Sequence, residues 1–267
     1  MHSPQPLGLK VGDDADDINL DLTLEKFSLS REFLAKILAA YGEMAKAPST
    51  EQFLSDGGLD RLVIASGGVT RDFLGIFRKS ITEARERLTR QPDHPRGPKI
   101  GAADVNLAAG SYGDTKREEF QRDTLEDRRL LEDAFEKVRL FCLSKTRVNV
   151  FLVDQDIQGD QYDLLQELID LRLVHHVRSR VTVGNKPGRI FRALLLDLSQ
   201  YTGERRRRDV NMLEFWDSKN KDVLRKPNLI YVPSITTEEL KQLLETDRKM
   251  RPGQADNDPS DQTEMEF

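Results

Sequence analysis

The first regular pattern in the chain is a strict alternation of apolar and polar residues over 18–24, where the sequence reads INLDLTL. A period of two predicts a strand with one buried face. No second strand pattern follows before residue 145. We therefore expect this strand to find no partner within 25–145, and its apolar face either to pack on helices or to stay exposed.

Apolar residues then recur at helical spacing. Ser28 or Ser30 can cap a first helix whose apolar positions run from Phe33 to Tyr41 and which ends before Pro48. A short helix follows and stops at Gly67 and Gly68. Thr70 is expected to cap a long helix whose apolar face contains Phe73, Leu74, Phe77, Ile81, Ala84 and Leu88.

The pattern changes in the second half of the chain. Residues 91–98 predict a loop and 100–109 a brief helix, which closes a helical domain near Gly113. The sequence then predicts a long helix over 116–143 and a buried strand over 148–153. A second helix is expected over 161–171, followed by a β-hairpin of 174–183 with 189–198. This is the element order of a winged-helix domain, although 154–160 leaves little room for its usual middle helix.

Together these patterns predict a mainly α fold with an α+β part. We divide the chain into an irregular lead-in, a helical domain that includes the first strand, a winged-helix-like domain with a β-hairpin wing, and a last helix with an acidic disordered tail. Their ranges are 1–17, 18–113, 114–233 and 234–267.

Composition narrows the class of protein. The net charge of −5 argues against an extended basic surface, so any contact with nucleic acid has to come from a local patch. The one cysteine, Cys142, lies in an apolar run and is interpreted as a small buried residue rather than a nucleophile. The single thiol, together with the lack of a membrane-length apolar run or a signal-peptide pattern, predicts a soluble cytoplasmic protein without a membrane partner.

The sequence lacks the usual motifs of catalysis. A phosphate-binding loop needs glycines followed by a lysine, and no Gly-Lys dipeptide occurs. His175 and His176 are neighbours on a predicted strand, so they face opposite sides and cannot chelate one metal ion together. We therefore expect no catalytic residue, no metal site and no cofactor held by this chain on its own. We also expect the chain neither to hydrolyse ATP nor to bind it tightly.

Arg71 falls in the first turn of the helix that follows Gly67 and Gly68. A helix N-terminus attracts anions through its free amide groups and its dipole, and Arg71 adds a formal positive charge there. Two interpretations remain open. Arg71 binds an anion, or it forms an ordinary surface ion pair with Asp72 or another neighbouring acid.

Two segments, IASGGVTRDFLGIFRKSITEA and KIGAADVNLAA, together with the 18–24 strand, resemble the end of AAA+ ATPases of the origin-recognition and initiator type. The resemblance covers about residues 18–200 and is most specific around 61–85. In that family a last core strand leads into a helical lid with a second-sensor arginine, and a winged-helix domain follows. The matching positions are Gly67 and Arg71 for the sensor, and Lys99, Ile100, Asp104, Val105 and Ala108 for the closing lid helix.

The resemblance implies a non-catalytic C-terminal segment of an initiator-like AAA+ ATPase. The P-loop core that the family places before residue 18 is missing from the sequence. ATP and Mg²⁺ are therefore implied only for a full-length form, in which Arg71 contacts a nucleotide held mostly by that core. The implied partners are an AAA+ core and double-stranded DNA. The alternative hypothesis is a free-standing winged-helix adaptor that docks a partner protein without nucleotide or DNA.

Charge indicates which part of such a domain would touch DNA. The predicted 161–171 helix and the residue before it carry Asp160, Asp163, Glu167 and Asp170, so phosphates would repel it. Basic residues gather instead on the hairpin and shortly after it: Arg178, Arg180, Lys186, Arg189, Arg192, Arg205, Arg206, Arg207 and Arg208. We expect these residues to carry any DNA binding; the alternative is ordinary solvated charge.

Overall fold

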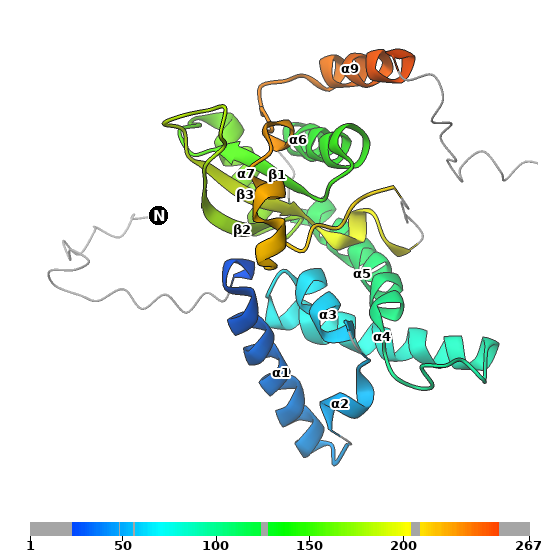
Figure 1. The fold of residues 1–267 in the computed structure, drawn as a ribbon. Coiled ribbons are helices and arrows are strands. Elements are labelled where there is room, and N and C mark those ends of the chain that lie inside the picture. Colours follow the sequence, from blue (N-terminus) through cyan, green and yellow to red (C-terminus); the bar gives the residue numbers. More distant parts are fainter. Residues whose placement is uncertain (1–22, 48, 56, 124–127, 204–208, 251–267) are drawn as a thin grey trace, which may run out of the picture.

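The computed structural model describes residues 23–47, 49–55, 57–123, 128–203 and 209–250 (Figure 1). The fold is mainly helical with one small antiparallel sheet, an α+β arrangement. The lead-in 1–17, most of the expected 18–24 strand, the arginines at 205–208 and the tail 251–267 lie outside the described residues. Leu24, which ends the expected strand, instead begins the 3₁₀ turn η1 (Leu24–Lys26) and is buried there.

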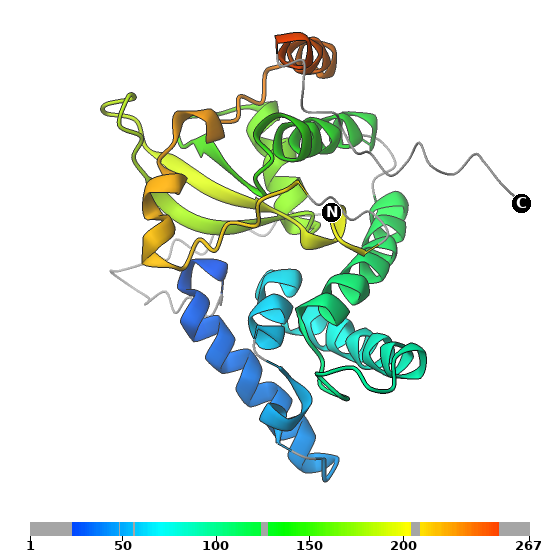
Figure 2. The same ribbon diagram turned by 45° about the vertical axis from the view of Figure 1, so that its right-hand side comes forward.

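Helices α1 (Phe27–Met44), α2 (Thr50–Phe53), α3 (Gly58–Ser66) and α4 (Thr70–Arg90) make up the helical half of the molecule (Figures 1 and 2). Helix α3 stops where the sequence predicted. The N–H groups of Gly67 and Gly68 bond the carbonyls of Ile64 and Val63, and Gly67 has a φ of 62°. Glycine adopts this left-handed conformation without strain, so it ends the helix and frees the chain to start α4.

Helix α5 (Ala102–Asp123) is longer than the helix predicted over 100–109. The expected helix ended at residue 109 and the expected domain boundary lay at 113, but α5 passes through both points. Its glycines serve close packing instead. A Cβ on Gly110 would lie 2.8 Å from the Cα of Gly203, and one on Gly113 would overlap the side chain of Ser199. Tertiary packing outweighs the roughly 1 kcal/mol that a glycine costs inside a helix.

Because α5 is continuous, it connects the helical half to the half that contains the sheet (Figure 2). The single helix expected over 116–143 is divided between elements. Its first residues belong to α5, and its later ones to α6 (Arg128–Leu140) and the π-helical turn η2 (Phe141–Thr146). Cys142 lies in that turn and is fully buried, as predicted.

The sheet contains β1 (Val150–Asp154), β2 (Val174–Val181) and β3 (Phe191–Leu196) in the order β1-β3-β2, with antiparallel neighbours. Helix α7 (Asp160–Asp170) lies between β1 and β2 in the sequence. The predicted hairpin is confirmed as the β2–β3 pair. All five residues of β1 are buried, which explains why its sequence is continuously apolar up to the final aspartate.

The remaining elements are short turns and one helix: η3 (Leu198–Gln200), η5 (Ser218–Asn220), α8 (Lys221–Leu224), η6 (Pro227–Leu229) and α9 (Thr237–Met250). The backbone N–H of Tyr231 bonds the carbonyl of Leu152 in β1 at 2.8 Å, so this segment packs on the sheet. Helix α9 lies beside α6, at the end of the molecule away from α1 (Figure 1). No helix of the described residues is long and apolar enough to cross a membrane.

Candidate functional site

The N-terminus of α4 lies between the helical half and the sheet. Val69, not Thr70, occupies the N-cap position, and no side chain caps the helix. The expected cap is therefore wrong by one residue, and valine has no oxygen with which to accept from the first-turn amides. Arg71 projects from this turn with a side chain that is 66% exposed, and its Nε lies 3.7 Å from Oδ1 of Asp72.

Asp72, one residue further on, is fully buried and contacts three residues, two from α5 and one from the turn between α7 and β2. Its Oδ1 accepts from Nη1 of Arg172 at 2.5 Å and from the hydroxyl of Tyr112 at 3.1 Å. Its Oδ2 lies 3.3 Å from Nζ of Lys116. Burial and the neighbouring carboxylate of Asp72 raise the pKa of Tyr112 to about 12, so its phenol stays protonated and donates this bond.

Lys116 extends the network from α5 to the residue that follows β3. Its Nζ lies 2.8 Å from Oδ2 of Asp197 and also donates to the carbonyl of Arg172 at 3.3 Å. Burial works to raise the pKa of Asp197, but the Lys116 ammonium and the hydrogen bond from His175 reverse this and hold it well below its usual range. Asp197 is therefore ionised, and the buried charges of Lys116 and Asp197 neutralise each other.

His175 of β2 closes the network. Its Nε2 lies 2.8 Å from Oδ2 of Asp197, while its ring rests on the Cα of Gly67, where an added Cβ would overlap it. His176 points elsewhere, with Nδ1 3.8 Å from Oε2 of Glu25. Adjacent strand residues thus take partners on different sides, as the sequence predicted. Helix α4, α5, β2 and the residue after β3 are joined around one set of buried charges.

Sequence reasoning identified Arg71 and Gly67 but missed Lys116, Asp197 and the role of Arg172. One signal was present for Asp72. It precedes Ile76 and Ser80 at intervals of four residues, and all three are buried on one face of α4. An acid on the buried face of a helix needs a positively charged partner. The partner itself could not be predicted, because it lies on a different element.

The basic residues of the hairpin differ in exposure and in their contacts. Arg180 and Lys186 are exposed. Arg189 is 59% exposed, but its Nη1 lies 3.2 Å from Oδ2 of Asp154. Arg192 is directed to α7, where its guanidinium carbon lies 4.8 Å from the ring centre of Tyr162 and Nη1 donates to the Tyr162 hydroxyl at 3.0 Å.

Glu25 binds the part of β2 where the pairing with β3 is irregular. Both its carboxylate oxygens accept from Ser179, one from the backbone N–H at 2.9 Å and one from the hydroxyl at 2.6 Å. The β2–β3 register shifts on either side of Arg178, so Glu25 holds the strand at a bulge. Burial works to raise the pKa of Glu25, but the two hydrogen bonds from Ser179 lower it, and the charge of Arg178 adds to this effect, which places this arginine close to an acid as well.

Cys142 and the possible metal ligands bear on reactivity. Burial raises the pKa of the Cys142 thiol well above its usual range, so no thiolate is available there for nucleophilic attack. Within the part of the chain that the structure describes, no group of three His, Cys, Asp or Glu side chains is arranged to hold a metal ion.

Comparison with known proteins yields no match: no family model, no curated protein and no solved structure matches this chain. Its function has to be argued from the residues themselves.

Proposed function

We propose that this chain is a non-catalytic segment of an initiator-like AAA+ ATPase, in which the helical half acts as a nucleotide-sensing lid. The observation that carries the proposal is the position of Arg71. It is an exposed cation in the first turn of a helix that has no capping side chain, so first-turn amides and a guanidinium can face the same anion. In a complete ATPase, Arg71 would contact a nucleotide phosphate held mainly by the core.

Asp72 supports this role by fixing the helix end. Its carboxylate is bound to Arg172, Tyr112 and Lys116. The acid next to Arg71 therefore has cationic partners of its own besides Arg71. The same contacts fix α4 to the half that carries the sheet, so that a phosphate at Arg71 acts on the whole body rather than on one helix.

The half that carries the sheet is proposed to be a winged-helix domain. The order α6, β1, α7, β2, β3 and the sheet order β1-β3-β2 support this assignment. Residues 155–159, between β1 and α7, form no helix, so the middle helix of such domains is reduced to a turn. In this proposal the hairpin is the wing, and it contacts the DNA backbone through Arg180, Lys186 and Arg189.

The sensor role is tested by titrating the whole chain with inorganic tripolyphosphate and recording amide chemical shifts by NMR. We expect the amides of Thr70, Arg71 and Asp72 to shift in the wild type. Arg71→Gln should remove most of that response, because it loses the charge while keeping a side chain of similar reach. Arg85→Gln, an exposed arginine further along α4, is the control and should respond as the wild type. Equal shifts in the wild type and Arg71→Gln would exclude Arg71 as the anion site.

A second candidate function is docking of a partner protein. It is favoured by a row of exposed apolar side chains on the outer face of α1: Leu29, Phe33, Tyr41 and Met44. Contiguous exposed apolar patches mark interaction surfaces. The acidic face of α7 offers a second surface that suits a basic protein and repels nucleic acid.

A further inference from the structure

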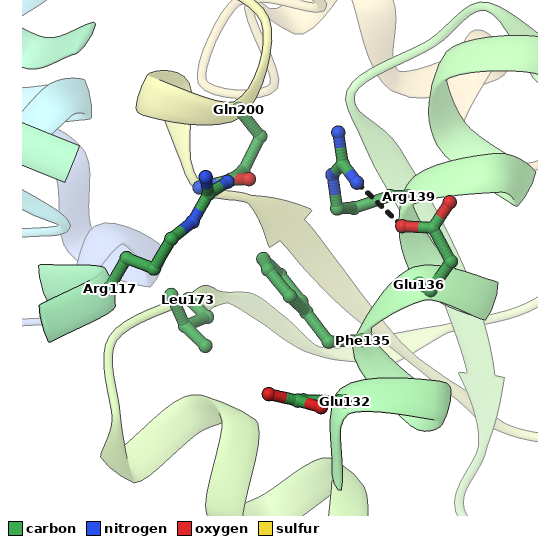
Figure 3. Close-up of a pocket in the computed structure, with 7 residues that line it drawn as sticks. All are labelled: Arg117, Glu132, Phe135, Glu136, Arg139, Leu173 and Gln200. Carbon is green, nitrogen blue, oxygen red and sulfur yellow. Dashed lines mark hydrogen bonds and ion pairs between the residues drawn. The ribbon is translucent and has the colours of Figure 1, made fainter. Parts of the chain in front are cut away.

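A pocket of about 280 Å³ lies against α6 (Figure 3). Arg117 of α5 lines it together with Leu173, just before β2, and Gln200 of η3. The other lining residues belong to α6: Glu132, Phe135, Glu136 and Arg139. Sites for drug-sized ligands measure about 300–1,000 Å³. This pocket therefore suits a smaller molecule or one group of a larger one.

Two buried polar atoms of these lining residues have no hydrogen-bond partner among the described residues: Oε1 of Gln200 and Nε of Arg139. The rest of each side chain is held in place. The amide nitrogen of Gln200, which is 3% exposed, donates to Oγ of Ser199 at 3.0 Å, and Nη1 of Arg139 donates to Glu136 at 2.5 Å. A buried polar atom without a partner destabilises the folded protein. One acceptor and one donor on the pocket wall thus remain to be satisfied.

The ring of Phe135 stands among the lining residues, with Leu173 on one side and Arg139 on the other (Figure 3). It offers an aromatic face to a planar group. The formal charges around it balance, since two arginines are matched by Glu132 and Glu136. A pocket with an aromatic wall, one acceptor, one donor and no net charge selects a flat, uncharged ring with polar edges over a simple anion.

We propose that this pocket binds a nucleotide base. Bases are planar, they stack on aromatic side chains, and their edges carry hydrogen-bond donors and acceptors side by side. Oε1 of Gln200 would accept from the base and Nε of Arg139 would donate to it. The base comes either from a free nucleotide or from an unpaired strand. The proposal is independent of the sensor role of Arg71 and of the hairpin.

The test is an NMR titration of the whole chain with four probes: adenosine, AMP, ribose 5-phosphate and a short oligodeoxyadenylate. Adenosine and AMP are expected to shift the amides of Phe135, Leu173 and Gln200 at millimolar concentration, whereas ribose 5-phosphate should leave them unchanged. Tighter binding of the oligonucleotide than of AMP would identify an unpaired strand as the source, and equal binding would identify the free nucleotide. Shifts caused equally by ribose 5-phosphate, or by none of the probes, would overturn the proposal.

Variants separate stacking from a general loss of packing. Phe135→Leu keeps an apolar side chain but removes the aromatic face, and should weaken binding about tenfold. Arg139→Lys keeps the charge but lacks the Nε donor, and should also weaken binding. It provides the test if Phe135→Leu proves too unstable to study. Arg85→Ala on α4 is the surface control. Unchanged affinity in a folded Phe135→Leu or Arg139→Lys protein would contradict base recognition at this site.

Discussion

Lys116 of α5 and Asp197, which follows β3, lie 81 residues apart in the sequence but form an ion pair of 2.8 Å in which both side chains are almost fully buried. The pair joins the helical half to the sheet. Because Lys116 also lies 3.3 Å from Asp72, next to the proposed sensor, a single ammonium group links the proposed nucleotide contact to the domain proposed to touch DNA.

Lys116→Met should destabilise the protein strongly. The substitution keeps the length of the side chain but leaves two buried carboxylates without their shared cation. Removing one partner of a buried ion pair costs about 3–5 kcal/mol. Urea denaturation should show this loss in the free energy of unfolding. Lys221→Met, at an exposed lysine of α8, is the matched control and should stay within about 0.5 kcal/mol of the wild type. A similar effect of both substitutions would show that Lys116 is not a structural cation.

Asp197 should make the protein sensitive to acid. Because its pKa is lower in the folded chain than in the unfolded chain, the unfolded state takes up the proton first as the pH falls. The stabilisation is complete above the ordinary aspartate pKa of about 3.9 and is lost progressively below it. Unfolding free energies measured from about pH 6 down to pH 3 should fall less steeply for Asp197→Asn than for the wild type. Parallel curves would argue against an ionised Asp197.

Gly67→Ala should lower the stability of the folded protein by more than its backbone conformation alone explains. Gly67 and Gly57 both have positive φ angles, 62° and 74°, but nothing lies within 4 Å of a Cβ added to Gly57, whereas the ring of His175 blocks one on Gly67. Gly57→Ala is expected to cost about 1 kcal/mol for the left-handed backbone. Gly67→Ala should cost a further 1–3 kcal/mol, roughly the cost of overpacking. Thermal unfolding of the two variants gives the comparison, and equal costs would mean that His175 does not pack on Gly67.

The contrast between Gly67 and Gly113 shows how far the sequence could predict the fold. Both glycines follow apolar helical patterns, and both were expected to lie near the end of a helical element. At Gly67 neighbouring residues determine where the helix ends, because they form the left-handed turn. At Gly113 the glycine is needed for a close contact with Ser199, which is distant in the sequence, and the helix continues. Signals within a few residues predicted α3, α4, α7 and the hairpin, whereas the division into domains depended on contacts across the chain.

The candidate site shows the same limit. The position of Arg71 after a glycine turn could be read from the sequence, but its neighbours Lys116 and Asp197 could not, because charged residues are common and their pairing is set by the fold. The hairpin arginines were expected to act as one basic surface. Their partners, Asp154 for Arg189 and Tyr162 for Arg192, come from other elements and reduce the number of available cations. These contacts could not be predicted from the charges alone.

The central functional claim is that the hairpin, and not α7, contacts duplex DNA. It is tested by fluorescence anisotropy of a labelled duplex over a range of salt concentrations. Each phosphate contact contributes about −0.9 to the slope of log affinity against log salt. Two variants are compared with the wild type. The hairpin variant replaces four basic residues with Gln: Arg178, Arg180, Lys186 and Arg189. The α7 variant replaces two acids, Asp163 and Glu167, with Ala.

The account predicts that the hairpin variant binds more weakly with a flatter salt slope, while the α7 variant binds as the wild type or slightly better. Residual binding in the hairpin variant would be assigned to the arginines at 205–208, whose removal should then abolish it. No binding by the wild type at low salt would favour docking of a partner protein instead. Loss of binding in the α7 variant, with normal binding in the hairpin variant, would contradict the account.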